Sequence, residues 1–107
     1  MKYGMRLLAV TAALVLWVGT ASAQTLNVAT FNIRLKVDSD AKKGDGWNQR
    51  ASKVCDVIKF HDFDLFGAQE VTYPQLLDML EMLPEYSYVG VGRDDGGKSG
   101  EFSPIFY

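Results

Sequence analysis

The residues Phe66–Val71 (FGAQEV) form a short apolar run that ends in a carboxylate, Glu70. With Asp64 and Leu65 before them they predict a strand, and the continuous apolar character is typical of a strand that is covered on both faces. A carboxylate at the end of such a strand has two interpretations. It either meets solvent where the strand leaves the sheet, or it belongs to a ligand site, because α/β enzymes bind their ligands at that edge.

A second β-prone segment, Leu26–Arg34, precedes this run in the chain. The polar, glycine-containing segment Asp38–Gly46 after it predicts a loop. Apolar residues then recur at helical spacing from Trp47 to Ile58, which predicts a helix over Trp47–His61. A strand, a helix and a strand in this order predict two parallel neighbouring strands that are joined by a crossover helix. We expect these two strands to be the central members of the sheet.

The rest of the chain predicts a second helix and two more strands. Thr72 and Gln75 have the spacing of a capping box that begins the helix, and Pro84 ends it. Three further segments are expected: a strand at 86–91, a flexible glycine-rich loop at 93–100 and a strand at 102–107. The element order β-α-β-α-β-β places the chain in the α/β class.

Residues 1–23 have the layout of a secretory signal peptide. A charged start is followed by the apolar stretch Leu7–Val18 and by the small-residue cleavage site Ala21–Ala23. The apolar stretch is shorter than the roughly 20 residues that cross a membrane. We therefore expect export to the periplasm or the extracellular space and cleavage after Ala23. The mature chain, residues 24–107, is then expected to have no membrane anchor.

The charge and cysteine content limit the classes of partner. The formal net charge is −2, and removal of Lys2 and Arg6 with the signal peptide makes the mature chain more acidic still. A globally basic surface for nucleic acid is absent, so a nucleic-acid partner is not favoured, although a local patch or a metal ion would still attract phosphate. Cys55 is the only cysteine, so no disulfide forms within the chain. Its place in the predicted helix indicates a small buried residue.

Three polar residues stand where predicted strands end or begin. Asn32 lies near the end of the first strand, Glu70 ends the second, and Glu101 follows the glycine-rich loop. If the first two strands are parallel neighbours, Asn32 and Glu70 meet at the carboxyl edge of the sheet. Amide and carboxylate oxygens suit Mg²⁺ or Mn²⁺, and Mg²⁺ needs only one or two protein carboxylates. Spacing alone leaves both interpretations open and favours a solvated strand end for Glu70 and a backbone-capping role for Asn32.

Several motifs, taken in order, resemble a known superfamily. They are Thr30–Arg34 (TFNIR), Gly46–Arg50 (GWNQR), Gly67–Val71 (GAQEV), Tyr88–Asp95 (YVGVGRDD) and Gly100–Tyr107 (GEFSPIFY). Together they resemble the secreted bacterial members of the endonuclease/exonuclease/phosphatase superfamily, which has the deoxyribonuclease I-like fold. The resemblance covers essentially all of residues 24–107. It implies that this segment is the N-terminal part of a four-layer α/β sandwich.

The resemblance also implies a reaction and roles for individual residues. Members of the superfamily are metal-dependent hydrolases of phosphoester bonds, of nuclease, phosphatase or phosphodiesterase type, and they use Mg²⁺ or Mn²⁺. Glu70 matches their metal-binding glutamate, and Asn32 matches the asparagine that helps to arrange the metal and the phosphate. Glu101 stands where these enzymes place a glutamate that supports a catalytic histidine. The partner implied is a phosphate-ester substrate whose type the sequence does not specify.

The sequence also departs from the superfamily pattern. The later motifs of the family, G-D-x-N and S-D-H, do not occur in it, and the chain stops inside an apolar strand at Tyr107. We therefore expect the N-terminal part of a longer domain, inactive alone and with exposed apolar surface. His61 is the only histidine, and its place at a polar helix end indicates a surface or helix-capping role. The alternative function is a non-catalytic exported binding domain with the same fold.

Overall fold

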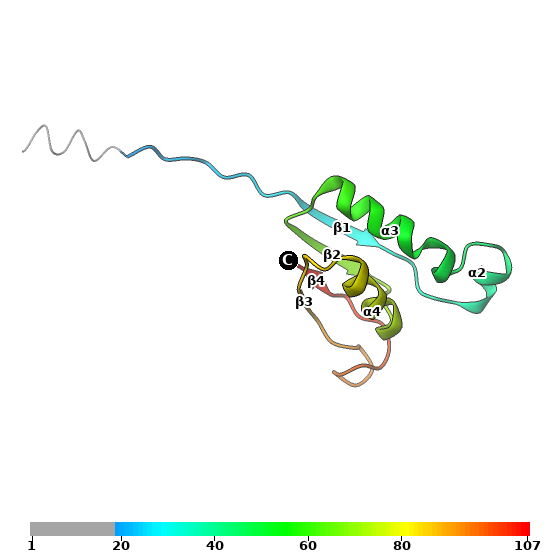
Figure 1. Cartoon of the computed structure of the whole chain (residues 1–107). Helices are drawn as coiled ribbons and strands as arrows, with labels where there is room; N and C mark the ends of the chain where they lie inside the picture. Colours follow the sequence, from blue (N-terminus) through cyan, green and yellow to red (C-terminus); the bar gives the residue numbers. More distant parts are fainter. Residues whose placement is uncertain (1–18) are drawn as a thin grey trace, which may run out of the picture.

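The computed structural model of the chain describes residues 19–107 (Figure 1). Most of the predicted signal peptide, residues 1–18, lies outside this part of the chain. Residues 19–27 lead to the first strand without forming a helix or a strand themselves. In the described part of the chain, no helix combines the length and the apolar character that crossing a membrane requires.

The described chain contains four strands and three helices, which confirms the predicted α/β class. The strands are β1 (Val28–Asn32), β2 (Leu65–Gln69), β3 (Tyr88–Val89) and β4 (Ile105–Phe106). The helices are α2 (Asp38–Lys42), α3 (Trp47–His61) and α4 (Tyr73–Met82). The short helix α2 is an addition to the predicted order, because it occupies part of the segment that was expected to be a loop. Acidic residues in its first turn and Lys42 in its last turn complement the helix dipole.

The four strands form one mixed sheet with the order β1-β2-β4-β3. β1 and β2 are parallel, with Val28 opposite Leu65 at one end and Asn32 opposite Gln69 at the other, which confirms the predicted parallel pair. β4 runs antiparallel to both β2 and β3. β2 and β4 are therefore the central strands. The expectation that β1 is central is wrong within the described sheet, because β4 takes the place on the other side of β2.

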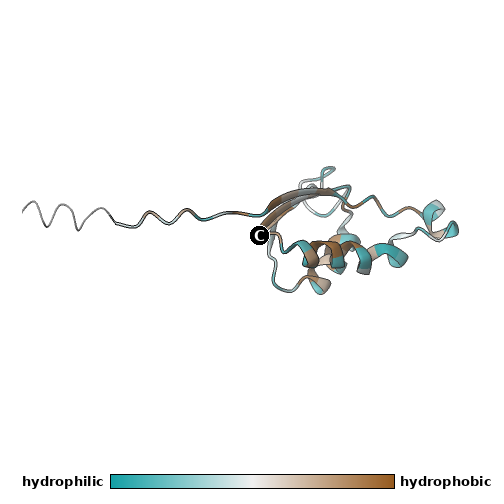
Figure 2. Cartoon of the chain, turned by 90° about the horizontal axis from the view of Figure 1, so that it is seen from above, coloured by the Kyte–Doolittle hydropathy of each residue, from teal (hydrophilic) through white to brown (hydrophobic). Residues whose placement is uncertain are grey.

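Helices α3 and α4 cover one face of the sheet, so the chain has a helix layer and a sheet layer (Figures 1 and 2). On the covered face of β2, Phe66 and Ala68 are buried, whereas their neighbours in the strand are half-buried. The prediction that β2 is covered on both faces therefore does not hold within residues 19–107. Phe66 stacks on Phe106 of β4 with ring centroids 4.7 Å apart and meets Tyr86 edge-on at 5.2 Å. These aromatic contacts join the strands to the core.

Helix α3 buries most of the apolar stripe that its sequence predicts, but Val54 of that stripe is only partly buried. Trp47, Ala51, Cys55 and Ile58 are its buried residues, and all four belong to the core beneath the sheet. The Trp47 indole Nε1 donates a hydrogen bond to Asp78 Oδ2 at 2.8 Å, which ties α3 to α4. Burial raises the pKa of the Cys55 thiol to about 11, so the thiol stays protonated at neutral pH. The prediction of a small buried cysteine is confirmed.

The other face of the sheet carries exposed apolar side chains. Val28 on β1, Val89 on β3 and Ile105 on β4 are 57%, 59% and 44% exposed. Scattered apolar residues on a surface are ordinary, but these three share one face of one sheet. The expectation of exposed apolar surface is confirmed. In the four-layer sandwich that the resemblance implies, the described residues supply two layers.

The segment between β3 and β4 is a closed, hydrogen-bonded loop rather than the flexible one that its glycines predict. The Gly92 N–H donates to the Gly97 carbonyl at 2.7 Å, and the Asp94 N–H donates to the Ser99 carbonyl at 3.0 Å. Asp95 Oδ1 accepts from the Gly97 and Ser99 N–H groups at 2.8 and 3.1 Å. These two donors hold the pKa of the Asp95 carboxyl below its usual value. The glycines of this loop allow its backbone segments to approach each other closely, and they do not make the loop disordered.

Replacing Gly92 by Ala should destabilise the protein. A Cβ at this position would lie 2.3 Å from the Ser99 carbonyl oxygen, which is backbone and has little freedom to move. We expect the free energy of unfolding to fall by about 1–3 kcal/mol, the usual cost of overpacking. Urea unfolding followed by circular dichroism measures it. Gly97→Ala is the matched control, because a Cβ there would meet Asp95 Oδ1 at an ordinary 3.4 Å. Equal unfolding midpoints for the two variants would contradict the prediction.

Candidate functional site

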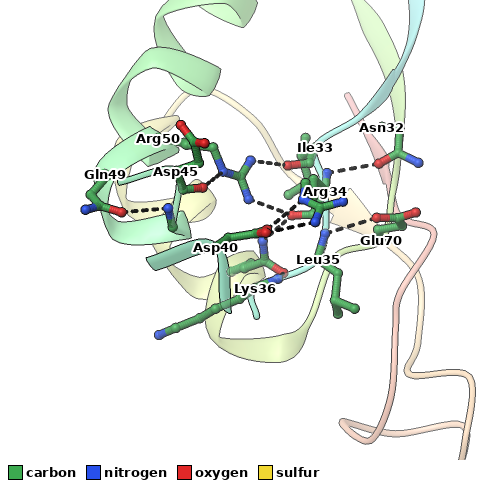
Figure 3. A network of polar contacts seen from close by, with 12 residues as sticks. Asn32, Ile33, Arg34, Leu35, Lys36, Asp40, Asp45, Gln49, Arg50 and Glu70 are labelled. Atoms are coloured by element: carbon green, nitrogen blue, oxygen red, sulfur yellow. Dashed lines mark hydrogen bonds and ion pairs between the residues drawn. The ribbon is translucent and has the colours of Figure 1, made fainter. Parts of the chain in front are cut away.

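Strands β1 and β2 end side by side, and their ends bring Asn32 and Glu70 together (Figure 3). Asn32 is the last residue of β1, and Glu70 directly follows β2. Glu70 Oε2 accepts a hydrogen bond from the Leu35 N–H at 3.1 Å, and Asn32 Oδ1 accepts one from the Arg34 N–H at 2.9 Å. The predicted meeting of Asn32 and Glu70 at the carboxyl edge is confirmed. Both side chains also hold the segment that leaves β1.

The backbone is unusual at both strand ends. Arg34 and Glu70 have φ values of 61° and 60°, in the left-handed region that residues other than glycine seldom adopt. Such conformations cost of order 1–3 kcal/mol each and persist only where the surrounding structure enforces them. Here each one turns the chain sharply after a parallel strand, and the turn at Glu70 brings its carboxylate to the Leu35 N–H. Backbone strain of this kind is characteristic of functional sites.

Glu70 is held in its ionised form. The Leu35 N–H, the adjacent Asn32 side chain and the positive charge of Arg34 lower the pKa of the Glu70 carboxyl, with Leu35 contributing most and partial burial opposing them. The carboxylate is therefore charged throughout the neutral range, and its interactions weaken only when the pH falls through this lowered pKa. The Glu70 carboxylate therefore accepts a backbone hydrogen bond in addition to meeting solvent, and its role in a ligand site stays a prediction. Asn32, in contrast, does take the backbone-capping role that spacing alone favoured.

Two side chains from the helices hold the segment that follows β1. Arg50 of α3 donates to the carbonyl oxygens of Ile33 at 2.6 Å and Arg34 at 3.1 Å. Gln75 of α4, which is fully buried, donates to the Arg34 carbonyl at 2.9 Å and accepts from the Lys36 N–H at 3.1 Å. Gln75 also accepts from the residue before α4, as the predicted capping box requires. The sequence pattern shows only this capping role, whereas the structure shows that the same side chain anchors the site segment.

An ion pair completes this support. Arg34 Nε lies 2.6 Å from Asp40 Oδ2, and Arg34 Nη2 lies 2.9 Å from Asp40 Oδ1. The guanidinium therefore donates two hydrogen bonds to the carboxylate (Figure 3). Asp40 belongs to α2 and is only 7% exposed. The Arg34 hydrogen bonds hold the pKa of the Asp40 carboxyl below its usual value. Helix α2 therefore serves to fix the Arg34 side chain next to the strand ends.

Glu70 and Glu101 line one open cavity of about 490 Å³ at this edge of the sheet. The lining residues are Gln69, Glu70, Val91, Arg93, Glu101 and Ser103. Arg93 Nη2 lies 2.7 Å from Glu101 Oε2, so the cavity lining holds a guanidinium paired with one of its two carboxylates. Asn32 does not line the cavity and acts on it through Glu70. Glu101 lines the cavity together with Glu70, and its catalytic role stays a prediction. Arg93 was not predicted, because a charged residue in a polar loop has the pattern of an ordinary solvated side chain.

The chemistry of these donors fits a hard divalent cation. Glu70 offers a carboxylate that is ionised at neutral pH and has one oxygen on the Leu35 N–H. The Asn32 amide oxygen, which lies outside the cavity lining, keeps a second lone pair beside its bond to the Arg34 N–H. Mg²⁺ typically keeps several waters and binds one or two protein carboxylates, so an open cavity suits it. Among residues 19–107, no group of three or more His, Cys, Asp or Glu side chains is placed to hold a metal. A cation here would therefore rely on few protein ligands.

His61 lies at the opposite edge of the sheet from Glu70. It ends α3 shortly before β2 begins, is exposed, and stacks on Phe63 with ring centroids 5.4 Å apart. Its carbonyl oxygen accepts a hydrogen bond from Asn27 Nδ2 at 2.6 Å. The prediction of a surface residue at a helix end is confirmed.

The fold and the site define an α/β protein with an acid-lined cavity at the carboxyl ends of two parallel strands. Solved structures with a similar fold are similar in sequence as well. An endonuclease/exonuclease/phosphatase family protein from Bacteroides thetaiotaomicron is 50% identical, with a TM-score of 0.79 over 80% of this chain and 32% of that one. A mannosyl-6-phosphatase from Bacteroides thetaiotaomicron is 52% identical, with a TM-score of 0.76 over 78% of this chain and 31% of that one. A family protein from Bacteroides vulgatus is 44% identical, with a TM-score of 0.73 over 78% and 32%.

The chain belongs to the endonuclease/exonuclease/phosphatase superfamily, as its motifs indicate. The phosphatase among its relatives is consistent with a family of phosphoesterase-type hydrolases. The chain spans about a third of the length of these solved structures. Comparisons with protein-family models and with curated proteins find no match.

Proposed function

We propose that this chain forms part of a metal-dependent hydrolase of phosphate esters and carries the metal-binding carboxylate of its active site. The observation that supports this most is that Glu70, held ionised by the Leu35 N–H, shares one cavity with Glu101 and Arg93. Glu70 would hold Mg²⁺ or Mn²⁺, with Asn32 fixing its orientation. Such a cation stabilises negative charge on the phosphate and on the leaving oxygen.

Arg93 would bind the phosphate itself. Its guanidinium is exposed in the cavity and uses Nη2 for Glu101, which leaves other N–H donors for phosphate oxygens. Arginine is well suited to this because its planar fork matches two phosphate oxygens at once. Among the described residues, Glu101 would orient the Arg93 side chain. The resemblance also implies that Glu101 supports a catalytic histidine, and this role would require a histidine other than His61.

We further propose a sugar phosphate as the class of substrate. A relative with 52% identity is a mannosyl-6-phosphatase, although the matched region covers only 31% of that protein. The acidic balance of the chain supports a small phosphate ester over a long nucleic acid, because a nucleic-acid surface would need clustered positive charge. The family membership alone is compatible with other phosphate esters.

Phosphate release from mannose 6-phosphate by the complete gene product tests this function. We expect hydrolysis that EDTA abolishes and that added Mg²⁺ or Mn²⁺ restores. The 107-residue chain assayed alone should be inactive with either metal, because a histidine in reach of the cavity is lacking among its described residues. Hydrolysis that is insensitive to EDTA would exclude the metal. Absence of phosphate release from mannose 6-phosphate and from other phosphate esters would favour the non-catalytic binding domain instead.

We also propose that the protein is exported. The signal-peptide layout of residues 1–23 supports periplasmic or extracellular location, with Gln24 as the first residue of the mature chain. N-terminal sequencing of the protein from the periplasmic and culture fractions tests this. Recovery of the exported protein with Met1 intact would contradict cleavage after Ala23.

A further inference from the structure

A second cavity adjoins the one that contains Glu70. Its volume is about 260 Å³, and its lining includes Thr72, Tyr73, Arg93, Lys98 and Glu101. Arg93 and Glu101 line both cavities, so the pair stands at the boundary between them. A molecule whose phosphate lies beside Glu70 and Arg93 would therefore place its remaining atoms in the second cavity.

Lys98 and Tyr73 give this cavity its chemical character. The Lys98 ammonium lies 5.0 Å from the centre of the Tyr73 ring, a cation–π distance. Among the described residues Lys98 makes no ion pair, so its three N–H donors are available to a ligand. The Tyr73 ring also stacks on the buried Phe102 ring, with centroids 6.2 Å apart, which fixes its position.

The loop that carries Lys98 is preorganised. Asp95 accepts hydrogen bonds from Gly97 and Ser99, the two residues on either side of Lys98. The Asp94 N–H bond to the Ser99 carbonyl closes the loop further. A side chain on such a loop loses little backbone freedom when it binds a ligand, and preorganisation of this kind favours affinity.

We propose that this second cavity is the subsite for the alcohol part of the substrate and that it takes a hydroxyl-rich group of hexose size. This inference rests on the proposed function, because it assumes a phosphate next to Glu70. Lys98 donates hydrogen bonds to sugar hydroxyls, the Tyr73 hydroxyl donates or accepts, and Glu101 accepts. A long nucleic acid is not favoured, because a strand needs a basic groove with several stacking platforms, whereas this cavity is small and its aromatic ring already faces Lys98.

Binding measured with Mg²⁺ present, so that a cation stays beside Glu70, tests the subsite without turnover when the phosphonate analogue of mannose 6-phosphate, which cannot be hydrolysed, stands for that ligand in every titration below. Isothermal titration calorimetry of the complete gene product with mannose 6-phosphate and with inorganic phosphate separates the sugar part of the affinity from the phosphate part. For Lys98→Met, we expect the affinity for mannose 6-phosphate to fall about tenfold more than that for inorganic phosphate, since hydrogen bonds to a charged donor are lost. Lys98→Arg should restore most of the difference. Lys53→Met, which removes an exposed lysine from α3, is the matched control and should change neither affinity.

Three results would overturn the subsite. They are a wild-type protein that binds mannose 6-phosphate no more tightly than inorganic phosphate, a Lys98→Met variant that loses both affinities equally, and a variant that loses neither. The proposed function fails separately, in the hydrolysis assay. A protein that does not release phosphate but shows the selective effect of Lys98→Met would have the sugar subsite and lack the catalysis.

Discussion

Replacing Glu70 by Gln should lower phosphate-ester hydrolysis by the complete gene product by about two orders of magnitude or more. The substitution keeps the shape of the side chain, and the new amide oxygen still accepts from the Leu35 N–H, but the negative charge that would hold a cation is gone. If the metal stabilises the transition state by several kcal/mol, losing its carboxylate ligand costs at least about two factors of ten, since each 1.36 kcal/mol is tenfold. The measurement is kcat/KM as a function of Mg²⁺ concentration. The Mg²⁺ concentration that gives half of the maximal kcat/KM should be higher for Glu70→Gln than for the wild type.

The Glu70→Gln substitution should leave the stability of the fold nearly unchanged. Glu70 is half-buried at a strand end and contributes little packing, so the urea unfolding midpoint should stay near that of the wild type. Glu81→Gln, at an exposed position on α4, is the matched control and should change neither activity nor metal dependence. Wild-type activity and metal dependence in Glu70→Gln would show that Glu70 is a strand end with no role in catalysis.

The parallel pair and its crossover helix could be predicted from the sequence because their signals are local. The apolar run that ends in Glu70 and the helical spacing that begins at Trp47 each lie within one element. The strand-helix-strand order then allows essentially one arrangement. The same pattern placed Asn32 and Glu70 at one edge, since parallel strands end together. Prediction succeeded where periodicity and chain order determine the geometry.

The rest of the sheet could not be predicted in this way. The edge position of β1 depends on the pairing of Phe66 with Phe106, two residues far apart in the sequence. Likewise, the polar sequence of the segment around Asp40 does not predict that Asp40 is buried against Arg34, because that contact exists only after the chain turns. These features arise from long-range packing, which periodicity does not encode.

The backbone conformation of the site and the residues that line its cavity also could not be predicted from the sequence. A left-handed φ at Arg34 and Glu70 has no local signal, because neither residue is Gly or Asn. The glycines around Arg93 indicate flexibility in the sequence, yet in the structure they permit the close contacts that make the loop compact. Arg93 becomes a candidate phosphate ligand only when the loop brings it to Glu101.

Replacing Gln75 by Met should disturb both the fold and the site. Gln75 is fully buried, and its amide binds the Arg34 carbonyl and the Lys36 N–H, which both lie in the segment after β1. Methionine fills a similar volume without these bonds. We expect a loss of about 2–3 kcal/mol in the free energy of unfolding, because removing one partner of a buried hydrogen bond costs about 1–3 kcal/mol for each group left unpaired, and the exposed Arg34 and Lys36 regain part of this from water.

Gln49→Met is the matched control, because it makes the same chemical change at an exposed residue with one capping bond, from the Gly46 N–H at 2.6 Å. Gln49→Met should lower the free energy of unfolding by about 1 kcal/mol, as the loss of a helix cap does in general. Equal unfolding midpoints for Gln75→Met and Gln49→Met would contradict the anchoring role of Gln75. Activity separates this role from that of Glu70: Gln75→Met should lose stability and hydrolysis together, because the segment that carries the Leu35 N–H is released, whereas Glu70→Gln should lose hydrolysis alone.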